Sequence, residues 1–276
     1  MEISPLPFSV LIMVYHKEKP ANFRLALKST MEQSLKPTEV VITRHGALPE
    51  GLNQVIEDFK AQYPEVIRIT DADSRYSLGH ARQVGLEACT HDYVAIMDAD
   101  DIARPNRFEV QFEFLKNHPE VDVLGSWIVE FSDSPERPQA VRQVPTGHQE
   151  ICRFARWRNP FNHMTVVFRK SAVLEVGSYR DIPYFEDYDL WVRMILAGKQ
   201  MANIGEVLVD ARAGQGMIAR RGGLKYVRQE LAFQWRSLKW GFISPLEFCK
   251  NLILRGSARI IPGRLRTILY GQLARS

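Results

Sequence analysis

The sequence has few cysteines and no long apolar stretch. The three cysteines among its 276 residues, Cys89, Cys152 and Cys249, lie far apart and form no Cys-x-x-Cys pair. This spacing argues against a disulfide framework or a structural zinc site and fits a reducing compartment. No stretch reaches the ~18–20 apolar residues that span a bilayer, and residues 1–8 lack the regions of a signal peptide. We therefore expect a cytoplasmic protein.

Acidic residues are scarce near the C-terminus. Residues 212–276 carry thirteen Lys and Arg against two acids, a net charge of +11, whereas residues 1–211 carry −7. The apolar fraction of 45% and charged fraction of 25% are ordinary for a globular protein. The asymmetry predicts that the C-terminal segment meets an anionic partner, for which phosphate groups at a lipid surface, a diphosphate ligand and nucleic acid are the candidates.

Short apolar runs alternate with amphipathic segments in the first half. The expected strands are Ser9–Tyr15, Glu39–Thr43, Val66–Thr70 and Tyr93–Met97, and the expected helices are Pro20–Gln33, Leu52–Tyr63 and Leu78–Cys89. This alternation predicts an α/β fold with a mostly parallel sheet that is covered by helices on both faces. Ligands of such sheets bind beyond the carboxyl ends of the strands.

The pattern is looser in the second half. We expect helices at Arg104–Asn117, with Pro105 in the first turn, and at Asp187–Ala197, and strands at Val121–Phe131, Met164–Phe168 and Glu206–Ala211. From residue 222 the chain predicts amphipathic helices that are broken at Ser244-Pro245 and Pro262-Gly263. The predicted division is an α/β domain over residues 1–221 and a basic helical extension over residues 222–276.

Three carboxylates directly follow the strand Tyr93–Met97, in the run Asp98-Ala99-Asp100-Asp101. Carboxylates crowded at a sheet edge repel one another unless a cation is present. Their oxygen atoms suit Mg²⁺ or Mn²⁺, which proteins often hold with one or two carboxylates and substrate phosphates. An acidic turn that caps the following helix is the structural alternative.

A second acidic group, Glu186, Asp187 and Asp189, lies at the start of a predicted helix among the aromatic residues Tyr184, Phe185, Tyr188 and Trp191. Helix capping accounts for one acid but not for three among four aromatics. Aromatic surroundings suit a sugar ring and raise a carboxylate pKa toward that of a working base.

Two further clusters carry polar side chains in turns. Asn159, Asn162 and His163 lie in the turn 158–165, where such groups can hydrogen-bond sugar hydroxyls. Arg220 and Arg221 stand beside glycines and could clamp a diphosphate, although a solvated basic loop is an equally good interpretation.

In this order the motifs resemble family 2 glycosyltransferases with the GT-A fold, and most closely the bacterial enzymes of amylovoran and O-antigen biosynthesis. The resemblance covers roughly residues 8–225 and rests on these segments: Ser9–Tyr15, Gly79–Leu86, Asp98–Asp101 with Pro105 and Arg107-Phe108, Asn159–Thr165, Phe185–Trp191 and Arg220–Gly223.

The resemblance implies an inverting, metal-dependent transfer of a sugar from a nucleotide-diphosphate donor, expected to be a UDP-sugar, to a hydroxyl of a saccharide acceptor. Asp98 and Asp100 match the D-x-D pair that holds the donor through Mn²⁺ or Mg²⁺, and Asp187 matches the catalytic base, with Glu186 as the second candidate. The other predicted donor contacts are Asp73, Arg82, Ala99, Arg220 and Arg221, and the predicted acceptor contacts are Asn162, His163 and Trp191.

One departure concerns the nucleobase. Enzymes of this family usually carry an acid that contacts the nucleobase after the second strand. Arg44-His45-Gly46 stands there instead, so Asp71 and Asp73 are the candidates to replace it.

The resemblance also implies an acceptor built on a polyprenyl diphosphate, in a lipid-linked polysaccharide or O-antigen precursor. Apolar and basic residues interleave over residues 250–269, as in a helix that lies on an anionic membrane. We expect a peripheral protein on the inner face of the bacterial cytoplasmic membrane. The alternative is that these apolar residues pack on the α/β domain.

Rival functions lack their sequence features. A metal-dependent nucleotidyltransferase acting on a sugar phosphate is the alternative function, but no glycine-rich loop follows the first strand. A dinucleotide-dependent oxidoreductase would carry a G-x-G-x-x-G at that place. We expect no nucleic-acid partner, because the carboxylate clusters would repel phosphate.

Overall fold

Strands and helices alternate in the N-terminal half of the protein, as the sequence predicts. A computed structural model describes residues 6–213 and 223–260. Its first elements are β1 (Phe8–Tyr15), α1 (Pro20–Met31), β2 (Glu39–His45), α2 (Glu50–Gln62), β3 (Ile67–Ala72), α3 (Leu78–Ala88) and β4 (Tyr93–Asp98). β1 lies between β2 and β4, β2 pairs with β3, and all these pairs are parallel.

The second half adds shorter elements around the same sheet. They are β5 (Ile102–Ala103), α4 (Arg107–Asn117), β6 (Val123–Phe131), β7 (Pro138–Arg142), α5 (His148–Phe154), the 3₁₀ helix η1 (His163–Thr165), β8 (Val167–Arg169), α6 (Lys170–Glu175), α7 (Glu186–Leu196) and β9 (Met201–Arg212). The strand order is β3-β2-β1-β4-β8-β6-β9-β5, with β7 paired to β6. β8 joins the sheet antiparallel to both β4 and β6.

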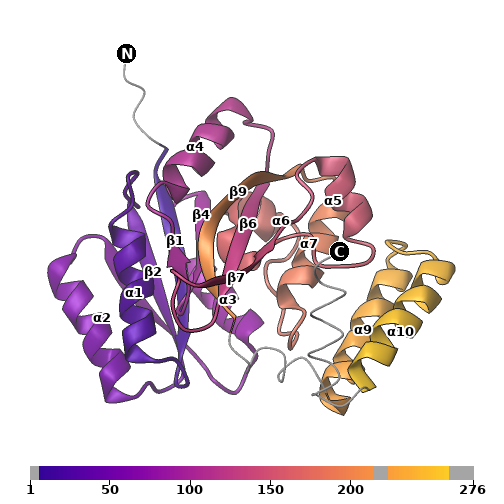
Figure 1. The fold of residues 1–276 in the computed structure, drawn as a ribbon, viewed down its shortest axis with the longest axis horizontal. Coiled ribbons are helices and arrows are strands. Elements are labelled where there is room, and N and C mark those ends of the chain that lie inside the picture. Colours follow the sequence, from indigo (N-terminus) through magenta and orange to yellow (C-terminus); the bar gives the residue numbers. More distant parts are fainter. Residues whose placement is uncertain (1–5, 214–222, 261–276) are drawn as a thin grey trace.

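Helices cover both faces of the sheet (Figure 1). On one face Val10 and Ile12 of β1 pack with apolar side chains of α1, α2 and α4. On the other face Leu11 of β1 packs in a cluster with Leu86 of α3 and Trp191 of α7. Successive side chains of a strand point to opposite faces, so an uninterrupted apolar strand feeds both cores. The predicted α/β fold is confirmed, and most paired strand residues lie in parallel ladders.

Several predicted boundaries are wrong. The helix expected from Arg104 begins at Arg107, because the Arg104 amide donates to the Leu208 carbonyl of β9 and Pro105 precedes the first turn. The strand expected at Met164–Phe168 is divided between η1 and β8. The sequence pattern did not predict β5, β7, α5 and α6, which are short; β7, for example, buries none of its five residues.

The chain ends, within its described part, in the helices α9 (Leu224–Lys239) and α10 (Pro245–Ile260). The predicted break at Ser244-Pro245 is confirmed. Ser244 and Glu247 cap α10 reciprocally: the Glu247 amide donates to Ser244 Oγ at 3.2 Å, and the Ser244 amide donates to Glu247 Oε2 at 2.7 Å. The break expected at Pro262-Gly263 lies outside the described residues.

An apolar cluster joins α9 to α7. Tyr226 and Phe233 of α9 pack with Phe185, Tyr188 and other apolar residues. The helix pair lies at the end of the molecule opposite α1 and α2 (Figure 1). The division at residue 221 stays a prediction, because residues 214–222 are outside the described part. None of the described helices is both long and apolar enough to cross a membrane.

Candidate active site

The two predicted acidic groups meet at the carboxyl edge of the sheet. Asp98 ends β4, which lies beside β1 with Asp98 opposite Met13. From β1 the chain goes to β2 and β3 on one side and then crosses to β4 on the other. Such a reversal of strand order opens a crevice at the carboxyl ends, where open α/β sheets bind ligands.

The three acids after β4 have different surroundings. The Asp98 side chain remains 31% exposed, and Asp100 is partly buried. Asp101 is buried, and its Oδ1 accepts a hydrogen bond of 2.7 Å from the Arg212 amide at the end of β9. Arg212 Nε also donates to the Asp100 carbonyl oxygen at 3.1 Å. Asp101 therefore fixes the acidic turn to β9, and Asp98 and Asp100 remain partly accessible.

The acids of α7 also differ from one another. Asp187 Oδ2 accepts a hydrogen bond of 2.6 Å from Asn159 Nδ2, and its Oδ1 accepts one of 2.7 Å from the Tyr188 amide. Asp189 is buried and pairs with Arg193 at 2.8 Å and with Arg236 of α9 at 3.5 Å. Asp189 is thus part of the helix packing, whereas Asp187 is partly exposed at the first turn.

Arg82 of α3 connects the two acidic groups. Its Nη1 forms an ion pair with Glu186 Oε1, and its Nη2 lies 3.7 Å from Asp98 Oδ1. The guanidinium and the Glu186 carboxylate are both largely buried. A single arginine therefore spans the end of β4 and the start of α7.

Two glycines bring α3 close to its neighbours. A Cβ atom at Gly79 would lie 2.0 Å from the Arg180 carbonyl oxygen and 2.9 Å from Glu186 Cβ. A Cβ atom at Gly85 would lie 2.2 Å from Thr43 Oγ1 of β2. Distances this short are steric clashes, so a side chain larger than that of glycine does not fit at Gly79 or Gly85, on either side of Arg82 in α3.

The site concentrates negative charge. Burial raises the pKa of Asp98 above its ordinary value in spite of the nearby Arg82, and the charge of Asp187 adds to the rise. The pKa of Glu186 is raised by burial against the opposing effect of Arg82. Burial alone would lower the pKa of Arg82. The negative charges of Glu186 and Asp98 outweigh this effect, so the pKa of Arg82 is raised. A cation beside Asp98 would offset the repulsion among these carboxylates.

The donor set fits a hard divalent cation. Asp98 and Asp100 offer only oxygen ligands, the type that Mg²⁺ and Mn²⁺ prefer. Among residues 6–213 and 223–260 no group of three or more His, Cys, Asp or Glu could hold a metal ion. Asp98 and Asp100 could therefore bind such an ion only if other ligands, such as phosphate oxygens and water, complete its coordination.

The predicted acceptor contacts are buried. The Trp191 side chain is fully buried with its ring centroid 5.2 Å from that of Phe161. Asn162 is also fully buried, and its Nδ2 donates to the Ser126 carbonyl oxygen at 2.8 Å. His163 lies 3.0 Å (Nε2) from the Tyr179 hydroxyl, and burial lowers its pKa well below the ordinary value. In this structure Asn162 and Trp191 therefore have no exposed surface for an acceptor.

The remaining predicted donor contacts have varied positions. Ala99 is buried within the acidic turn. The Asp73 carboxylate accepts hydrogen bonds from the Arg75 amide at 2.8 Å and from Arg75 Nε at 2.7 Å. Asp71, the other candidate for the nucleobase, is held by Arg44 through bonds of 2.7 and 2.8 Å. Arg220 and Arg221 lie outside the described residues.

Three residues order the site in roles that the sequence did not predict. Asn159 holds Asp187, Arg212 holds Asp101, and Arg107 supports β4. Arg107 is fully buried, donates to the Ile96 carbonyl oxygen at 2.7 Å, and has its pKa lowered to about 9 by that burial. The turn Asn159-Pro160-Phe161-Asn162 was a signal for Asn159. Arg107 belongs to the Arg107-Phe108 pair on which the family resemblance partly rests, although no role was predicted for it. No local signal marks Arg212, because its partners Asp100 and Asp101 are distant in the sequence.

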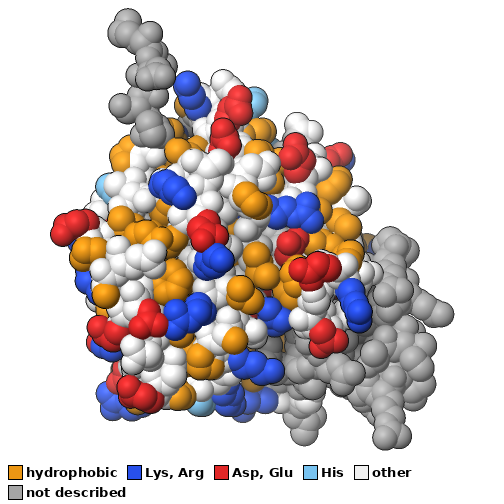
Figure 2. Space-filling model, turned by 60° about the vertical axis from the view of Figure 1, so that its left-hand side comes forward, with side chains coloured by type: hydrophobic (Ala, Val, Ile, Leu, Met, Phe, Trp, Pro, Cys, Tyr) orange, Lys and Arg blue, Asp and Glu red, His pale blue; other side chains and the backbone are white. Residues whose placement is uncertain are grey.

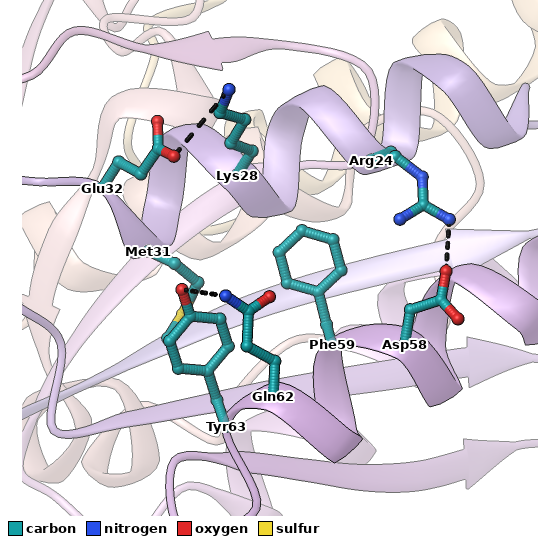
Figure 3. Close-up of a pocket in the computed structure, with 8 residues that line it drawn as sticks. All are labelled: Arg24, Lys28, Met31, Glu32, Asp58, Phe59, Gln62 and Tyr63. Carbon is teal, nitrogen blue, oxygen red and sulfur yellow. Dashed lines mark hydrogen bonds and ion pairs between the residues drawn. The ribbon is translucent and has the colours of Figure 1, made fainter.

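A pocket elsewhere lies between α1 and α2 (Figure 3). Its volume is about 240 Å³, and its charged residues pair with each other: Arg24 with Asp58 at 2.5 Å and Lys28 with Glu32 at 3.8 Å. The molecular face seen in Figure 2 mixes acidic and basic side chains. Neither this pocket nor this face has a cluster of carboxylates like the one at the end of β4.

Comparisons with known proteins agree with this geometry. Residues 9–182 match the model of the family described as Glycosyl transferase family 2. The chain is 38% identical over 266 residues to the amylovoran biosynthesis glycosyltransferase AmsE of Erwinia amylovora, covering 95% of this chain and 97% of that protein. It is 35% identical over 268 residues to an Escherichia coli UDP-Gal:alpha-D-GlcNAc-diphosphoundecaprenol beta-1,3-galactosyltransferase, covering 97% and 96%.

A solved structure shares the fold. The mannosyltransferase PcManGT from Pyrobaculum calidifontis, in complex with GDP-Man and Mn²⁺, superposes with a TM-score of 0.64 at 15% identity, covering 99% of this chain and 83% of that one. At this identity the likeness concerns the fold alone. With the family match and the two relatives, it leads to one conclusion: the chain belongs to glycosyl transferase family 2 and is a glycosyltransferase with the GT-A fold.

Proposed function

We propose that the protein is an inverting, metal-dependent hexosyltransferase. It moves a sugar from a nucleoside-diphosphate donor, a UDP-sugar, onto a hydroxyl of a saccharide acceptor. The acceptor is a lipid-linked polysaccharide or O-antigen precursor, and the enzyme works at the inner face of the bacterial cytoplasmic membrane.

One observation carries the proposal: Arg82 contacts both acidic groups, from Asp98 at the end of β4 to Glu186 at the start of α7. A donor held at the first group and an acceptor activated at the second would therefore face each other across one crevice. Sugar transfer needs such proximity of the leaving diphosphate and the attacking hydroxyl.

On the donor side Asp98 and Asp100 would hold Mn²⁺ or Mg²⁺. When bound, that ion neutralises the charge that develops on the departing diphosphate. Asp101 keeps the turn in place through the Arg212 amide, and the buried Arg107 supports the last residues of β4. The solved mannosyltransferase relative with GDP-Man and Mn²⁺ supports the assignment of a divalent ion.

On the acceptor side Asp187 would take the proton of the attacking hydroxyl. Asn159 holds one carboxylate oxygen by donating a hydrogen bond, which fixes its direction. Glu186 already forms an ion pair with Arg82, so it is the weaker candidate for the base. Direct attack opposite the leaving group inverts the anomeric centre in one displacement.

The acceptor and the membrane are proposed from a relative and from the surface of α10. The Escherichia coli relative is named for a GlcNAc-diphosphoundecaprenol acceptor. In α10, Leu246, Ile253 and Leu254 are 72%, 70% and 63% exposed, and Lys250 lies on the same helix. An exposed apolar stripe with basic residues is typical of helices that lie on anionic membranes.

A donor screen tests the proposal. The purified protein is incubated with UDP-, GDP- and dTDP-sugars, with Mn²⁺ or with EDTA, and nucleoside diphosphate release is measured. We expect one UDP-sugar to be used, with release abolished by EDTA and weakened nucleotide binding in Asp100→Asn. Inversion is checked by NMR of the product anomer. Activity that survives complete chelation would exclude the metal-dependent mechanism.

A further inference from the structure

The exposed aromatic residue nearest to Asp187 in sequence is Tyr184. It lies in the loop between α6 and α7, and its side chain is 45% exposed. The other aromatic residues of this segment, Phe185, Tyr188 and Trp191, are all buried. Of the four aromatics that the sequence placed around the acids, only Tyr184 presents its ring to a ligand in solution.

Aromatic packing fixes the position of the Tyr184 ring. Its centroid lies 5.2 Å from that of Tyr226 of α9. Tyr226 in turn lies 5.3 Å from Phe185, whose ring stacks on Phe233 at 5.3 Å with an angle of 10°. Tyr184 is therefore the exposed end of a buried aromatic row rather than an isolated surface side chain.

The backbone holds Tyr184 in an unusual conformation. Its φ angle is +69°, and among the described residues Ser178 is the other non-glycine residue with a positive φ. A bulky residue adopts this region unfavourably. The surrounding packing thus keeps an exposed tyrosine where glycine would be less strained.

Tyr184 is also close to the proposed base. Three residues of extended chain span at most ~10 Å, so the backbones of Tyr184 and Asp187 are within that distance. Asp187 belongs to the first turn of α7, directly after this loop, with its carboxylate held by Asn159. The two residues are therefore close enough along the chain for one oligosaccharide to reach both.

We propose that Tyr184 is the acceptor-binding platform and takes the place of the buried Trp191 in that role. Its ring face packs on the C–H face of a pyranose ring of the acceptor, and its hydroxyl hydrogen-bonds a ring substituent. This inference rests on the proposed function. It also gives α9 a part in acceptor binding, because Tyr226 supports the platform.

The test measures acceptor kinetics of Tyr184→Ala and Tyr184→Phe. The probes are soluble p-nitrophenyl glycosides of galactose, glucose and N-acetylglucosamine, with the donor found in the screen held at saturation. Stacking on an aromatic ring contributes enough to raise the acceptor KM about tenfold in the alanine variant. The phenylalanine variant should show a smaller rise, because it keeps the ring and loses only the hydroxyl.

Donor binding separates a platform from a merely structural residue. We expect the Kd of UDP with Mn²⁺, measured by calorimetry, to stay within twofold of wild type in Tyr184→Ala. Trp235→Ala is the matched control, because Trp235 is a similarly exposed aromatic on α9, and its acceptor KM should not change. Tyr184→Gly, which suits the positive φ, should fold stably and still show the high KM.

The outcomes distinguish this inference from the function on which it rests. The platform inference would fail, and the proposed function would stand, if Tyr184→Ala had wild-type acceptor kinetics. The same conclusion would follow if this variant weakened donor and acceptor binding equally. A wild-type protein that releases no nucleoside diphosphate from any donor would overturn the proposed function and the platform with it.

Discussion

At the scale of single residues, the neighbouring acids Glu186 and Asp187 show how surroundings separate chemical roles. Glu186 is buried in an ion pair with Arg82, whereas Asp187 is partly exposed and held by the neutral amide of Asn159. The Glu186 side chain is only 8% exposed and faces the arginine, so little of its carboxylate is accessible to an acceptor hydroxyl. A carboxylate that is oriented by an amide keeps its charge available for a hydroxyl proton.

Asp187→Asn should lower kcat strongly and leave donor binding intact. The amide has the shape of the carboxylate but cannot take a proton, and general-base help is typically worth ~10²- to 10⁴-fold. Steady-state kinetics and calorimetry with UDP and Mn²⁺ measure the two effects. Glu186→Gln is the comparison and should instead reduce the melting temperature, because it leaves Arg82 without its buried partner. A near-normal kcat in Asp187→Asn would remove Asp187 as the base.

The three thiols should differ in reactivity. Burial raises the pKa of the Cys89 thiol to about 12, with the charge of Glu39 adding to the effect, whereas Cys249 is exposed and Cys152 intermediate. The thiolate is the reactive form, so Ellman's reagent at pH 8 should label Cys249 quickly, Cys152 slowly and Cys89 only in denaturant. Peptide mapping identifies each label. Rapid labelling of Cys89 in the native protein would contradict its buried position.

Charged residues of the site could be singled out from the sequence more readily than its neutral ones. Burying carboxylates such as Asp98 at the end of an apolar strand costs free energy unless a partner compensates their charge, so such residues in a sequence point to a binding site. Trp191 gave no such signal, since an aromatic residue beside acids suits either a sugar or the core. Its burial depends on which face of α7 meets the sheet, and that is decided by contacts with Phe161 and Phe168 from distant segments.

At the scale of elements, long periodic segments could be predicted and short ones could not. β1, α2 and β4 have apolar patterns that are strong enough to fix their type and place. The exposed β7 forms because β6 offers an edge, and the helix α4 starts late because Arg104 bonds to β9. Such elements depend on partners far away in the chain.

Gly79→Ala should push α3 away from α7 and disturb the site. The new methyl group would meet the Arg180 carbonyl oxygen at 2.0 Å, a backbone atom that cannot swing aside. Overpacking of this kind typically costs ~1–3 kcal/mol, so we expect a lower free energy of unfolding and reduced kcat, measured by urea denaturation and by the donor assay.

Gly205→Ala is the matched control, because its added Cβ atom would make ordinary contacts of 3.6 Å and beyond. We expect it to keep the wild-type activity and nearly the wild-type stability. Equal behaviour of the two variants would show that the approach of α3 to α7 does not order the site.

At the scale of the whole molecule, charge is distributed unequally along the chain. The face seen in Figure 2 mixes both signs, whereas the segment 212–276 has a net charge of +11. α9 and α10 extend from the α7 side, so the proposed acceptor platform and the apolar stripe of α10 belong to one end of the molecule (Figure 1). This arrangement would suit an acceptor whose sugar reaches the site while its lipid stays in a membrane.

Leu246→Gln with Ile253→Gln should therefore weaken binding to vesicles of phosphatidylglycerol and phosphatidylethanolamine. Both side chains are at least 70% exposed, so the fold should tolerate the change, and each buried aliphatic side chain contributes ~1.5–3 kcal/mol of transfer free energy. Vesicle flotation at two salt concentrations measures the apolar and the ionic contributions, because salt screens only the latter. Leu25→Gln with Leu174→Gln is the control, because these leucines are also exposed, at 45% and 43%, but lie on α1 and α6 instead of α10; it should bind as wild type does. If the α10 variant floats with vesicles as completely as this control, the stripe on α10 is not the membrane contact.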